Sequence, residues 1–293
     1  MLLRFLLLVL AGIYYIVFKF HHRICLREGQ PLSHAQLIVV GSYLAGGAGK
    51  TPFVAWLAQF ISSNSRQVPH IAILCHCKAP DEATMLRQKF AGVSQVRVIA
   101  TSNRYKTAHE IDRDYDYIIC DDGFEDTRLT GATTIRLDWG EPPAGIADLL
   151  PAGKCRSLPA DHDEPALALR CGADIRFEIE RIVNESGAAF NPEQHPDAAI
   201  ACGIGDSNRF VRDLEANGIH SQDIIRRPDH DGNFEQTINN LLARGKPVII
   251  TEKDAARLHR DIRNNPDVYV AYQQASMSGQ ALDRLREALL QGK

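Results

Sequence analysis

The residues best suited to chemistry in this sequence lie in one short loop, SYLAGGAGKTP. Three glycines crowd the loop, and Lys50 and Thr51 follow the last of them. Glycine lets backbone N–H groups turn toward an anion, and the start of a following helix adds its positive end. A lysine at this point reaches the terminal phosphates of a nucleotide, and a threonine hydroxyl binds Mg²⁺. The loop therefore predicts a nucleoside triphosphate site.

The loop departs at one position from the usual phosphate-binding pattern. The pattern G-x-x-x-x-G-K-[ST] has glycine where this chain has Leu44. The glycines at 46 and 47 are expected to supply the turn instead, and Pro52 suits the first turn of a helix. The alternative is a strand-to-helix connection that binds no ligand. The residues predicted to hold the nucleotide are Leu44, Ala45, Gly46, Gly47, Ala48, Gly49, Lys50 and Thr51.

A second group of candidate residues ends the apolar stretch YDYIIC. Asp121 and Asp122 follow that stretch directly. Beside a phosphate loop, a carboxylate at the carboxyl end of a neighbouring strand binds the metal ion or its water. The alternative for two adjacent aspartates is a solvated turn. Next to this loop, the pair predicts a metal site made by Thr51, Asp121 and Asp122.

The composition narrows the class of protein. The chain has 293 residues, 45% hydrophobic and 24% charged, as in folded proteins with one large or two modest domains. A net charge of -3 provides no basic field, so nucleic acid is not expected as a partner. The seven cysteines are odd in number and include no CxxC pair, which indicates a reducing compartment. Cys75-His76-Cys77 is interpreted as a strand end with buried thiols rather than as a zinc site.

The N-terminus has the composition of a membrane anchor. The stretch from Phe5 to Phe18 carries no charge. As a helix it is about 21 Å long, against a bilayer core of about 30 Å, so with its apolar flanks it either spans or lies deep in one leaflet. Several cations follow it, including Lys19 and Arg23, and they favour the cytoplasmic face. A retained anchor is favoured over a cleaved signal peptide or a buried core helix.

The rest of the chain alternates short apolar runs with stretches of helical spacing. This alternation predicts an α/β fold, a P-loop NTPase-like and mostly parallel sheet covered on both faces. Its expected strands are AQLIVVG, HIAILC, VRVIA, YDYIIC, TTIRLD and PALAL, with helices at 51–62 and 81–92. DIRFEIERIV and a polar loop follow as a linker, and AAIACGIG, a helix at 210–217, KPVIITEKDAARL and DVYVAYQ predict a second α/β unit. The expected domains are a membrane-associated helix at 1–29, a P-loop core at 30–173, linker strands and loop at 174–196, and a smaller α/β domain at 197–293.

Two turns in this second unit are interpreted as helix starts. Thr251 with Asp254 has the spacing of a capping box, and Asp206 stands where an N-cap is expected. Lys253 and Arg209 are not explained by capping. They remain candidates to face phosphate or other anionic groups.

Taken in order, the motifs resemble those of the tetraacyldisaccharide 4′-kinase family, the lipid A kinases of Gram-negative bacteria. The matching stretches are VVGSYLAGGAGKTP, DDGFED, DLLPAGKCRSLP, CGIGDSNRF, RPDHDGNF and VIITEKDAARL. The family's phosphate loop likewise lacks the early glycine. The resemblance covers most of the chain, and it includes the apolar N-terminus.

The resemblance implies transfer of the γ-phosphoryl group of ATP, with Mg²⁺, to the 4′-hydroxyl of a tetraacylated glucosamine disaccharide 1-phosphate. Such a lipid-linked substrate stays in the bilayer, at about 0.8 kcal/mol per buried CH₂. The implied location is the cytoplasmic face of a bacterial inner membrane, reached peripherally or through a single span. The family's proton-handling pair corresponds to Asp81 in APDEAT and His230 in PDHDGNF. With Lys50 these are the predicted catalytic residues, and the sequence leaves protein partners unknown.

Two departures from the family leave other functions open. HCKAPDEA replaces the family's Ser-Arg-Gly-Tyr-Gly stretch, and Glu125 and Asp126 replace a glutamine and a histidine. Added acid at the site is expected to repel an anionic substrate, unless Lys78, Lys154 and Arg156 compensate. The alternatives are a P-loop kinase acting on another membrane lipid or sugar and a nucleotide-binding paralogue without catalysis.

Overall fold

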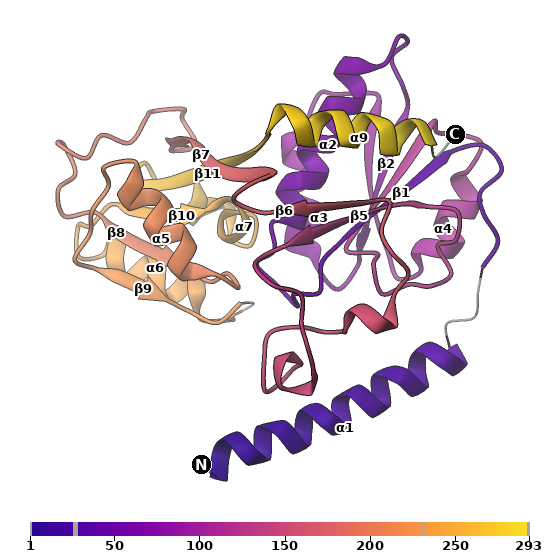
Figure 1. The fold of residues 1–293 in the computed structure, drawn as a ribbon. Coiled ribbons are helices and arrows are strands. Elements are labelled where there is room, and N and C mark those ends of the chain that lie inside the picture. Colours follow the sequence, from indigo (N-terminus) through magenta and orange to yellow (C-terminus); the bar gives the residue numbers. More distant parts are fainter. Residues whose placement is uncertain (1, 26–28, 230, 292–293) are drawn as a thin grey trace. The chain divides into compact units, whose positions relative to one another are not determined.

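The computed structural model describes residues 2–25, 29–229 and 231–291 (Figure 1). The chain divides into two compact units, which are described separately. The first comprises Met1–Arg176 together with Ser276–Lys293, and the second comprises Phe177–Ala275. The two boundaries fall inside strands β7 (Ile175–Val183) and β11 (Val268–Met277).

The first unit is built on a six-stranded sheet in the order β3-β2-β4-β1-β5-β6. Each neighbouring pair is parallel. In β1, Leu37 and Val39 face one side and Ile38 and Val40 the other, and all four are buried, so both faces of the sheet are covered. The strands are β1 (Gln36–Gly41), β2 (Ile71–His76), β3 (Val96–Thr101), β4 (Tyr117–Asp121), β5 (Thr133–Asp138) and β6 (Leu167–Arg170).

Helices connect these strands and carry the covering side chains. Ala108, from one of them, is buried against the face that holds Leu37, Val39 and Leu74. The last helix returns to the first unit, where the Gln36 Nε2 atom donates to the Leu289 carbonyl at 2.8 Å. The helices of this unit are α2 (Lys50–Asn64), α3 (Pro80–Lys89), α4 (Arg104–Ile111) and α9 (Gly279–Gln291), with short 3₁₀ turns η1 (Ile146–Asp148) and η2 (Pro159–Asp161).

The register of β1 and β4 determines which loops meet. Val40 lies opposite Asp121, so the two strands end side by side at the carboxyl edge of the sheet. Gly41 permits a close approach there, because a Cβ at this position would lie 2.1 Å from the Phe124 Cβ atom. The phosphate loop and the Asp121–Asp122 pair therefore leave the sheet together.

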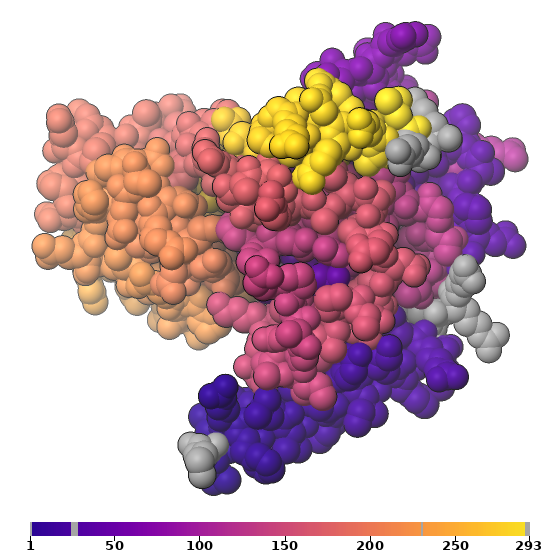
Figure 2. All heavy atoms as spheres, in the orientation of Figure 1, coloured from indigo at the N-terminus to yellow at the C-terminus, as the bar shows by residue number. Residues whose placement is uncertain are grey.

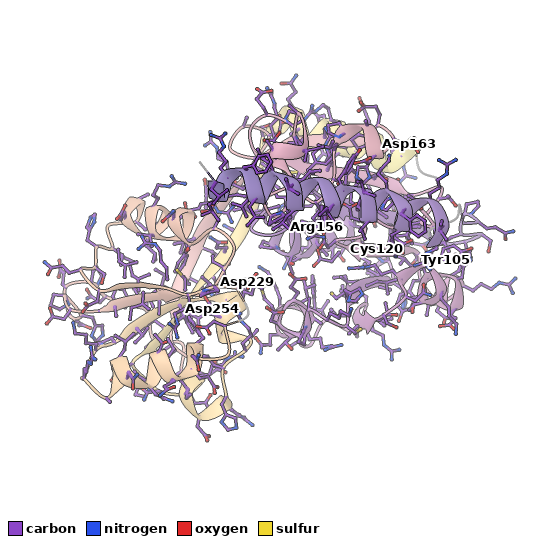
Figure 3. All side chains as sticks on the ribbon, turned by 90° about the horizontal axis from the view of Figure 1, so that it is seen from below. Tyr105, Cys120, Arg156, Asp163, Asp229 and Asp254 are labelled. Atoms are coloured by element: carbon purple, nitrogen blue, oxygen red, sulfur yellow. The ribbon has the colours of Figure 1, made fainter. Side chains whose placement is uncertain are left out.

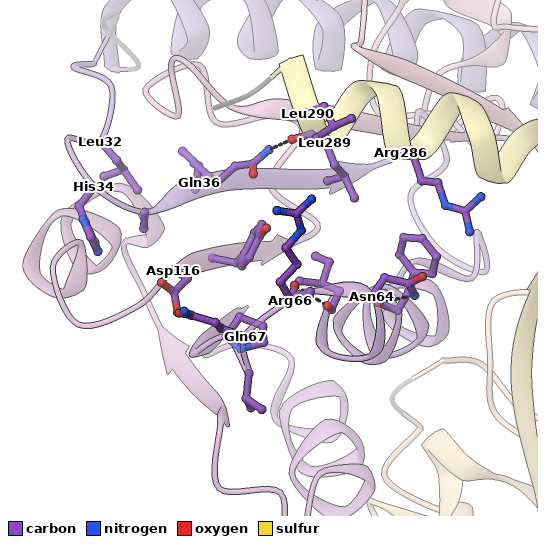
Figure 4. Close-up of a pocket in the computed structure, with 18 of the residues that line it drawn as sticks. Leu32, His34, Gln36, Asn64, Arg66, Gln67, Asp116, Arg286, Leu289 and Leu290 are labelled. Carbon is purple, nitrogen blue, oxygen red and sulfur yellow. Dashed lines mark hydrogen bonds between the residues drawn. The ribbon is translucent and has the colours of Figure 1, made fainter.

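An open pocket of about 1160 Å³ lies at the opposite end of the same sheet, where β1 and β4 begin (Figure 4). It is lined by the segment that enters β1, by the end of α2 and by α9, including Gln36, Arg66 and Arg286. The six residues of β1 separate this pocket from the phosphate loop by about 20 Å. The pocket is therefore not part of the candidate site.

Helix α1 (Leu2–Cys25) is the one described helix that is long and apolar enough to cross a membrane. Its outward side chains are exposed, with Phe5 and Ile16 both above 60%. It lies along the segment that carries η1 and η2 (Figures 1 and 2). The residues less exposed than their neighbours recur along one side of the helix, namely Leu7, Leu8, Ala11, Gly12, Tyr14, Tyr15, Phe18 and His22.

The second unit has its own core around the sheet β7-β11-β10-β8-β9. The β11-β10, β10-β8 and β8-β9 pairs are parallel. Thr251 and Asp206 cap their helices through side-chain bonds, from the Asp254 and Arg209 amides, as the sequence indicates. The remaining elements are β8 (Ala199–Cys202), β9 (Ile224–Arg226), β10 (Val248–Thr251), α5 (Ser207–Ala216), α6 (Phe234–Leu242), α7 (Glu252–Ala255) and α8 (Arg260–Arg263).

The expected fold class is confirmed: a mostly parallel α/β sheet, an apolar N-terminal helix and a second sheet unit. The domain limits of 174–196 and 197–293 differ from the compact units, which place residues 276–293 with the first sheet. Arg284 and Asp174 form an ion pair at 3.2 Å there, in addition to the bond between Gln36 and Leu289. The sequence pattern of α9 shows that it is amphipathic but not which sheet it covers.

Candidate active site

The phosphate loop has the backbone that an anion site requires. Gly47 and Gly49 adopt positive φ angles of 73° and 75°, which residues with a Cβ rarely adopt. Gly49 is the N-cap of α2, and its carbonyl accepts the Phe53 amide at 3.1 Å. The N-terminus of a helix of 15 residues thus opens directly onto the loop.

A distant segment braces the loop. The Ala45 amide donates to the Lys154 carbonyl at 3.0 Å, and the Arg156 amide donates to the Tyr43 carbonyl at 2.8 Å. The Arg156 Nη2 atom also donates to the Ala45 carbonyl at 2.6 Å. From the other side, Trp139 Nε1 donates to the Ala48 carbonyl at 3.0 Å. These bonds hold the loop carbonyls of Tyr43, Ala45 and Ala48 in place.

The structure brings the predicted lysine, threonine and aspartates together. Thr51 Oγ1 donates to Asp121 Oδ2 at 2.9 Å, and Lys50 Nζ lies 3.3 Å from Asp122 Oδ1. Lys50 and Thr51 are each only 8% exposed. Arg156 Nη2 donates to the other oxygen of Asp122 at 2.8 Å. The four predicted residues therefore form one contact network at the carboxyl edge of the sheet.

Asp121 and Asp122 occupy different electrostatic environments. Asp122 has a φ of 56°, in the left-handed region, which turns its carboxylate away from the strand toward Lys50 and Arg156. Burial acts to raise the pKa of Asp122, but Lys50 and Arg156 outweigh it and hold that pKa below its usual range. Burial raises the pKa of Asp121, and the charges of Glu82 and Asp122 raise it further.

The donor set suits a hard divalent cation. Among the described residues, the Asp121 Oδ1 atom is buried without a hydrogen-bond partner. A buried carboxylate oxygen is stable when a cation or donor reaches it. Together with the Thr51 hydroxyl, it offers the oxygen ligands that Mg²⁺ prefers. These residues therefore fit the ion that the sequence predicts.

Of the two predicted proton-handling residues, the structure describes only Asp81. Asp81 lies in the first turn of α3 and is 2% exposed. Its helix follows β2, the neighbour of β4, so it leaves the sheet at the same edge as Asp121. His230 lies outside the described residues.

The sequence did not single out three side chains near the site. Arg104 Nη2 donates to the Asp121 carbonyl at 2.7 Å, and Trp139 bonds the loop. The negative charge of Glu82 raises the pKa of Asp121. Arg104 is the first residue of the helix that follows β3. Ligands of parallel sheets bind at the carboxyl ends of the strands, so this position could have marked Arg104 as a candidate from the sequence.

The acidic departures from the family are neutralised internally. Asp126 Oδ1 accepts from Arg128 Nε at 2.7 Å. Glu125 accepts a 2.8 Å bond from the buried Ser157 hydroxyl, and burial raises the pKa of Glu125 to about 7. Of the cations expected to compensate, Arg156 pairs with Asp122. The repulsion expected from these two acids is accordingly smaller than their formal charges suggest.

Cys75 and His76 end strand β2, and Cys77 follows it directly. Within residues 2–25, 29–229 and 231–291, no group of three or more His, Cys, Asp or Glu side chains is arranged to hold a metal. Cys75 is buried in β2, and burial raises its thiol pKa, so the thiol stays protonated. Cys77 is exposed, which corrects the expectation that both thiols are buried.

A glycine-rich turn between β1 and α2, followed by lysine and threonine and faced by an aspartate at the end of the adjacent parallel strand, defines the class of P-loop α/β proteins. Within that class, the chain matches the family described as tetraacyldisaccharide-1-P 4′-kinase, LpxK, over residues 3–72 and 76–291. The chain belongs to this family.

Similar proteins carry the same name. A tetraacyldisaccharide 4′-kinase of Chlamydia trachomatis is 24% identical over 76% of this chain and 72% of its own length. The protein of that name from Halothermothrix orenii is 28% identical over 84% of this chain and 81% of its own. The crystal structure of LpxK from Aquifex aeolicus in complex with ATP has a TM-score of 0.68 and 19% identity and covers 99% of both chains, which supports the fold.

Proposed function

We propose that this chain transfers the γ-phosphoryl group of ATP to the 4′-hydroxyl of a tetraacylated glucosamine disaccharide 1-phosphate, a step of lipid A synthesis. The observation that carries the proposal is the network of Lys50, Thr51, Asp121 and Asp122 at the mouth of the phosphate loop. The family and the names of the similar proteins support the acceptor. The Aquifex aeolicus protein, solved with ATP, supports the donor.

The residues of the loop bind and orient the triphosphate. Loop amides and the α2 N-terminus hold phosphate oxygens, and Lys50 Nζ moves from Asp122 to the terminal phosphates. Thr51 and Asp121 would hold Mg²⁺, which would supply positive charge to the phosphate oxygens. Arg156 keeps Asp122 ionised beside this centre.

Asp81 and His230 handle the proton of the sugar hydroxyl in this proposal. A hydroxyl attacks phosphorus effectively only when a base accepts its proton, and histidine titrates near neutral pH. His230→Ala is therefore expected to lower the turnover number far more than the affinity for ATP. Steady-state kinetics with both substrates varied measures this difference, and an unchanged turnover number removes His230 from the mechanism.

Helix α1 attaches the enzyme to the cytoplasmic face of the inner membrane, peripherally rather than by crossing it. The less exposed stripe from Leu7 to His22 covers 16 residues, about 24 Å of helix that lies along the protein itself. Because this stretch packs on the protein, it is not available to cross a bilayer core of about 30 Å. The opposite, apolar side of α1 faces the acyl region, where the lipid substrate resides.

Lys50→Ala tests the proposal directly. Purified full-length protein is incubated with labelled ATP, Mg²⁺ and the 1-phosphorylated disaccharide lipid. We expect wild-type protein to form the 4′-phosphorylated product and Lys50→Ala to form none. Wild-type turnover by Lys50→Ala contradicts the mechanism, because Lys50 is the charge that contacts the phosphates.

Glu125 and Asp126 give reason to test a second acceptor. A growth assay in cells depleted of their own lipid A kinase separates the possibilities. Rescue supports the disaccharide lipid as acceptor. Failure with measurable ATP hydrolysis supports another membrane lipid or sugar, and ATP binding without turnover supports a non-catalytic role.

A further inference from the structure

The core-facing side of α1 is joined to the protein by specific polar contacts. The Tyr14 hydroxyl donates to the Arg156 carbonyl at 2.9 Å. One residue further, the Tyr15 hydroxyl donates to Asp161 at 2.9 Å, and Lys19 pairs with the same carboxylate at 2.9 Å. An apolar anchor needs none of these bonds to enter a bilayer. They indicate a defined docking of α1 on the segment 156–161.

Arg156 stands between this docked helix and the phosphate loop. Its carbonyl accepts from Tyr14, its amide donates to Tyr43, and its guanidinium donates to Ala45 and Asp122. Figure 3 shows Arg156 beside α1. One path from the anchor to the loop therefore runs through a single residue and four hydrogen bonds.

The guanidinium of Arg156 is sensitive to where its backbone lies. It reaches two acceptors in two different segments with one terminal nitrogen, at 2.6 Å and 2.8 Å. A planar guanidinium meets such a pair only in a narrow range of positions. A shift of the Arg156 backbone thus loosens either the loop carbonyl at Ala45 or the ionised Asp122 that faces Lys50.

From this geometry we infer that α1 is a positioning element of the nucleotide site, with Tyr14 acting through Arg156, in addition to its role at the membrane. The inference rests on the proposed function, since it assumes that the loop binds ATP. Docking of α1 holds the loop in its phosphate-binding form. A change in α1 then alters ATP binding even where no membrane is present.

Tyr14→Phe, with Tyr15→Phe as its matched control, tests the inference. Each change removes one hydroxyl from neighbouring positions of α1, but only Tyr14 bonds to Arg156. ATP binding with Mg²⁺ is measured by calorimetry on full-length protein in detergent micelles without lipid substrate. We expect Tyr14→Phe to weaken binding about three- to tenfold, the effect of one net hydrogen bond, and Tyr15→Phe to change it less than twofold.

Arg156→Lys provides the second arm, because lysine cannot serve both acceptors with the same geometry. In that background, Tyr14→Phe is expected to have a smaller effect on ATP binding than in the wild type, because the two guanidinium bonds are lost and only the backbone bond to Tyr43 remains. A full additional loss in the double variant overturns the inference, as does equal binding by Tyr14→Phe and Tyr15→Phe. If wild-type protein itself fails to bind ATP, the proposed function fails instead.

Discussion

Replacing Asp112 by asparagine is expected to destabilise the first unit by about 2 kcal/mol at neutral pH. The buried Asp112 carboxylate accepts four hydrogen bonds from the segment that enters β1. Three come from Ser33 and Ala35: the Ser33 amide at 2.8 Å, its hydroxyl at 2.6 Å and the Ala35 amide at 2.8 Å. The fourth comes from the His34 amide at 3.1 Å. Asparagine offers one acceptor oxygen where the carboxylate offers two.

The magnitude follows from the pKa of Asp112. Burial acts to raise this pKa, but the bonds from Ser33, Ala35 and His34 outweigh burial and lower it from 3.8 to about 2. At 1.36 kcal/mol per pKa unit, the difference corresponds to about 2 kcal/mol. The unfolded chain binds more protons than the folded one between pH 4 and 2. The contribution is therefore complete above about pH 4, falls to about 1 kcal/mol at pH 3 and is lost below pH 2.

Urea unfolding of full-length protein in detergent micelles measures this effect. Trp56 and Trp139 both belong to the first unit and report its unfolding by fluorescence. Asp114→Asn is the control, since Asp114 is exposed nearby. The reasoning is refuted if Asp112→Asn and Asp114→Asn unfold alike at pH 7. A difference between them that does not shrink at pH 3 refutes the assigned origin.

Two further changes probe the phosphate loop and the acidic turn. Gly49→Ala is expected to cost about 1 kcal/mol in stability and to weaken ATP binding, because alanine disfavours a φ of 75°. Gly46→Ala is the control and is expected to be tolerated, because a Cβ at Gly46 meets open space and its φ is ordinary. Thermal unfolding and ATP titration measure both, and equal effects of the two changes count against the backbone argument. Glu125→Gln is expected to stabilise the protein above pH 7, by at most about 3 kcal/mol, because burial raises the folded-state pKa of Glu125 from 4.5 to about 7 and its ionised form opposes folding. Asp126→Asn should instead destabilise the protein slightly, because it weakens the ion pair with Arg128. Urea unfolding at pH 6 and pH 8.5 distinguishes the effects of these two substitutions. A Glu125→Gln protein that is less stable than wild type at pH 8.5 contradicts the prediction.

The central strands β1, β2 and β4 of the first sheet were predictable because each is a short buried apolar run. Their burial on both faces requires such runs, and the pattern AQLIVVG matches β1 (Gln36–Gly41) closely. The phosphate loop was predictable for a related reason. Its glycines, lysine and threonine are neighbours in the chain, so their geometry is largely local.

The partners of those residues were not predictable from the same pattern. Arg156 reaches Ala45 from 111 positions away, and Arg104 reaches the Asp121 carbonyl from the helix after another strand. The sequence also did not indicate that α9 covers the first sheet. Amphipathic spacing indicates that a helix has an apolar face, but the surface against which this face packs depends on the tertiary structure.

The sequence by itself determined that this chain has a phosphate loop, an acidic strand end and an apolar helix, because glycine conformation, strand burial and hydrophobic length are properties of contiguous residues. Only the tertiary structure decided how these parts are connected. It set Asp122 between Lys50 and Arg156, gave Asp121 its buried free oxygen, and laid α1 against the segment that braces the loop. Those pairings depend on charge, burial and distance across the fold, which residues far apart in the chain acquire only when the strands assemble in register.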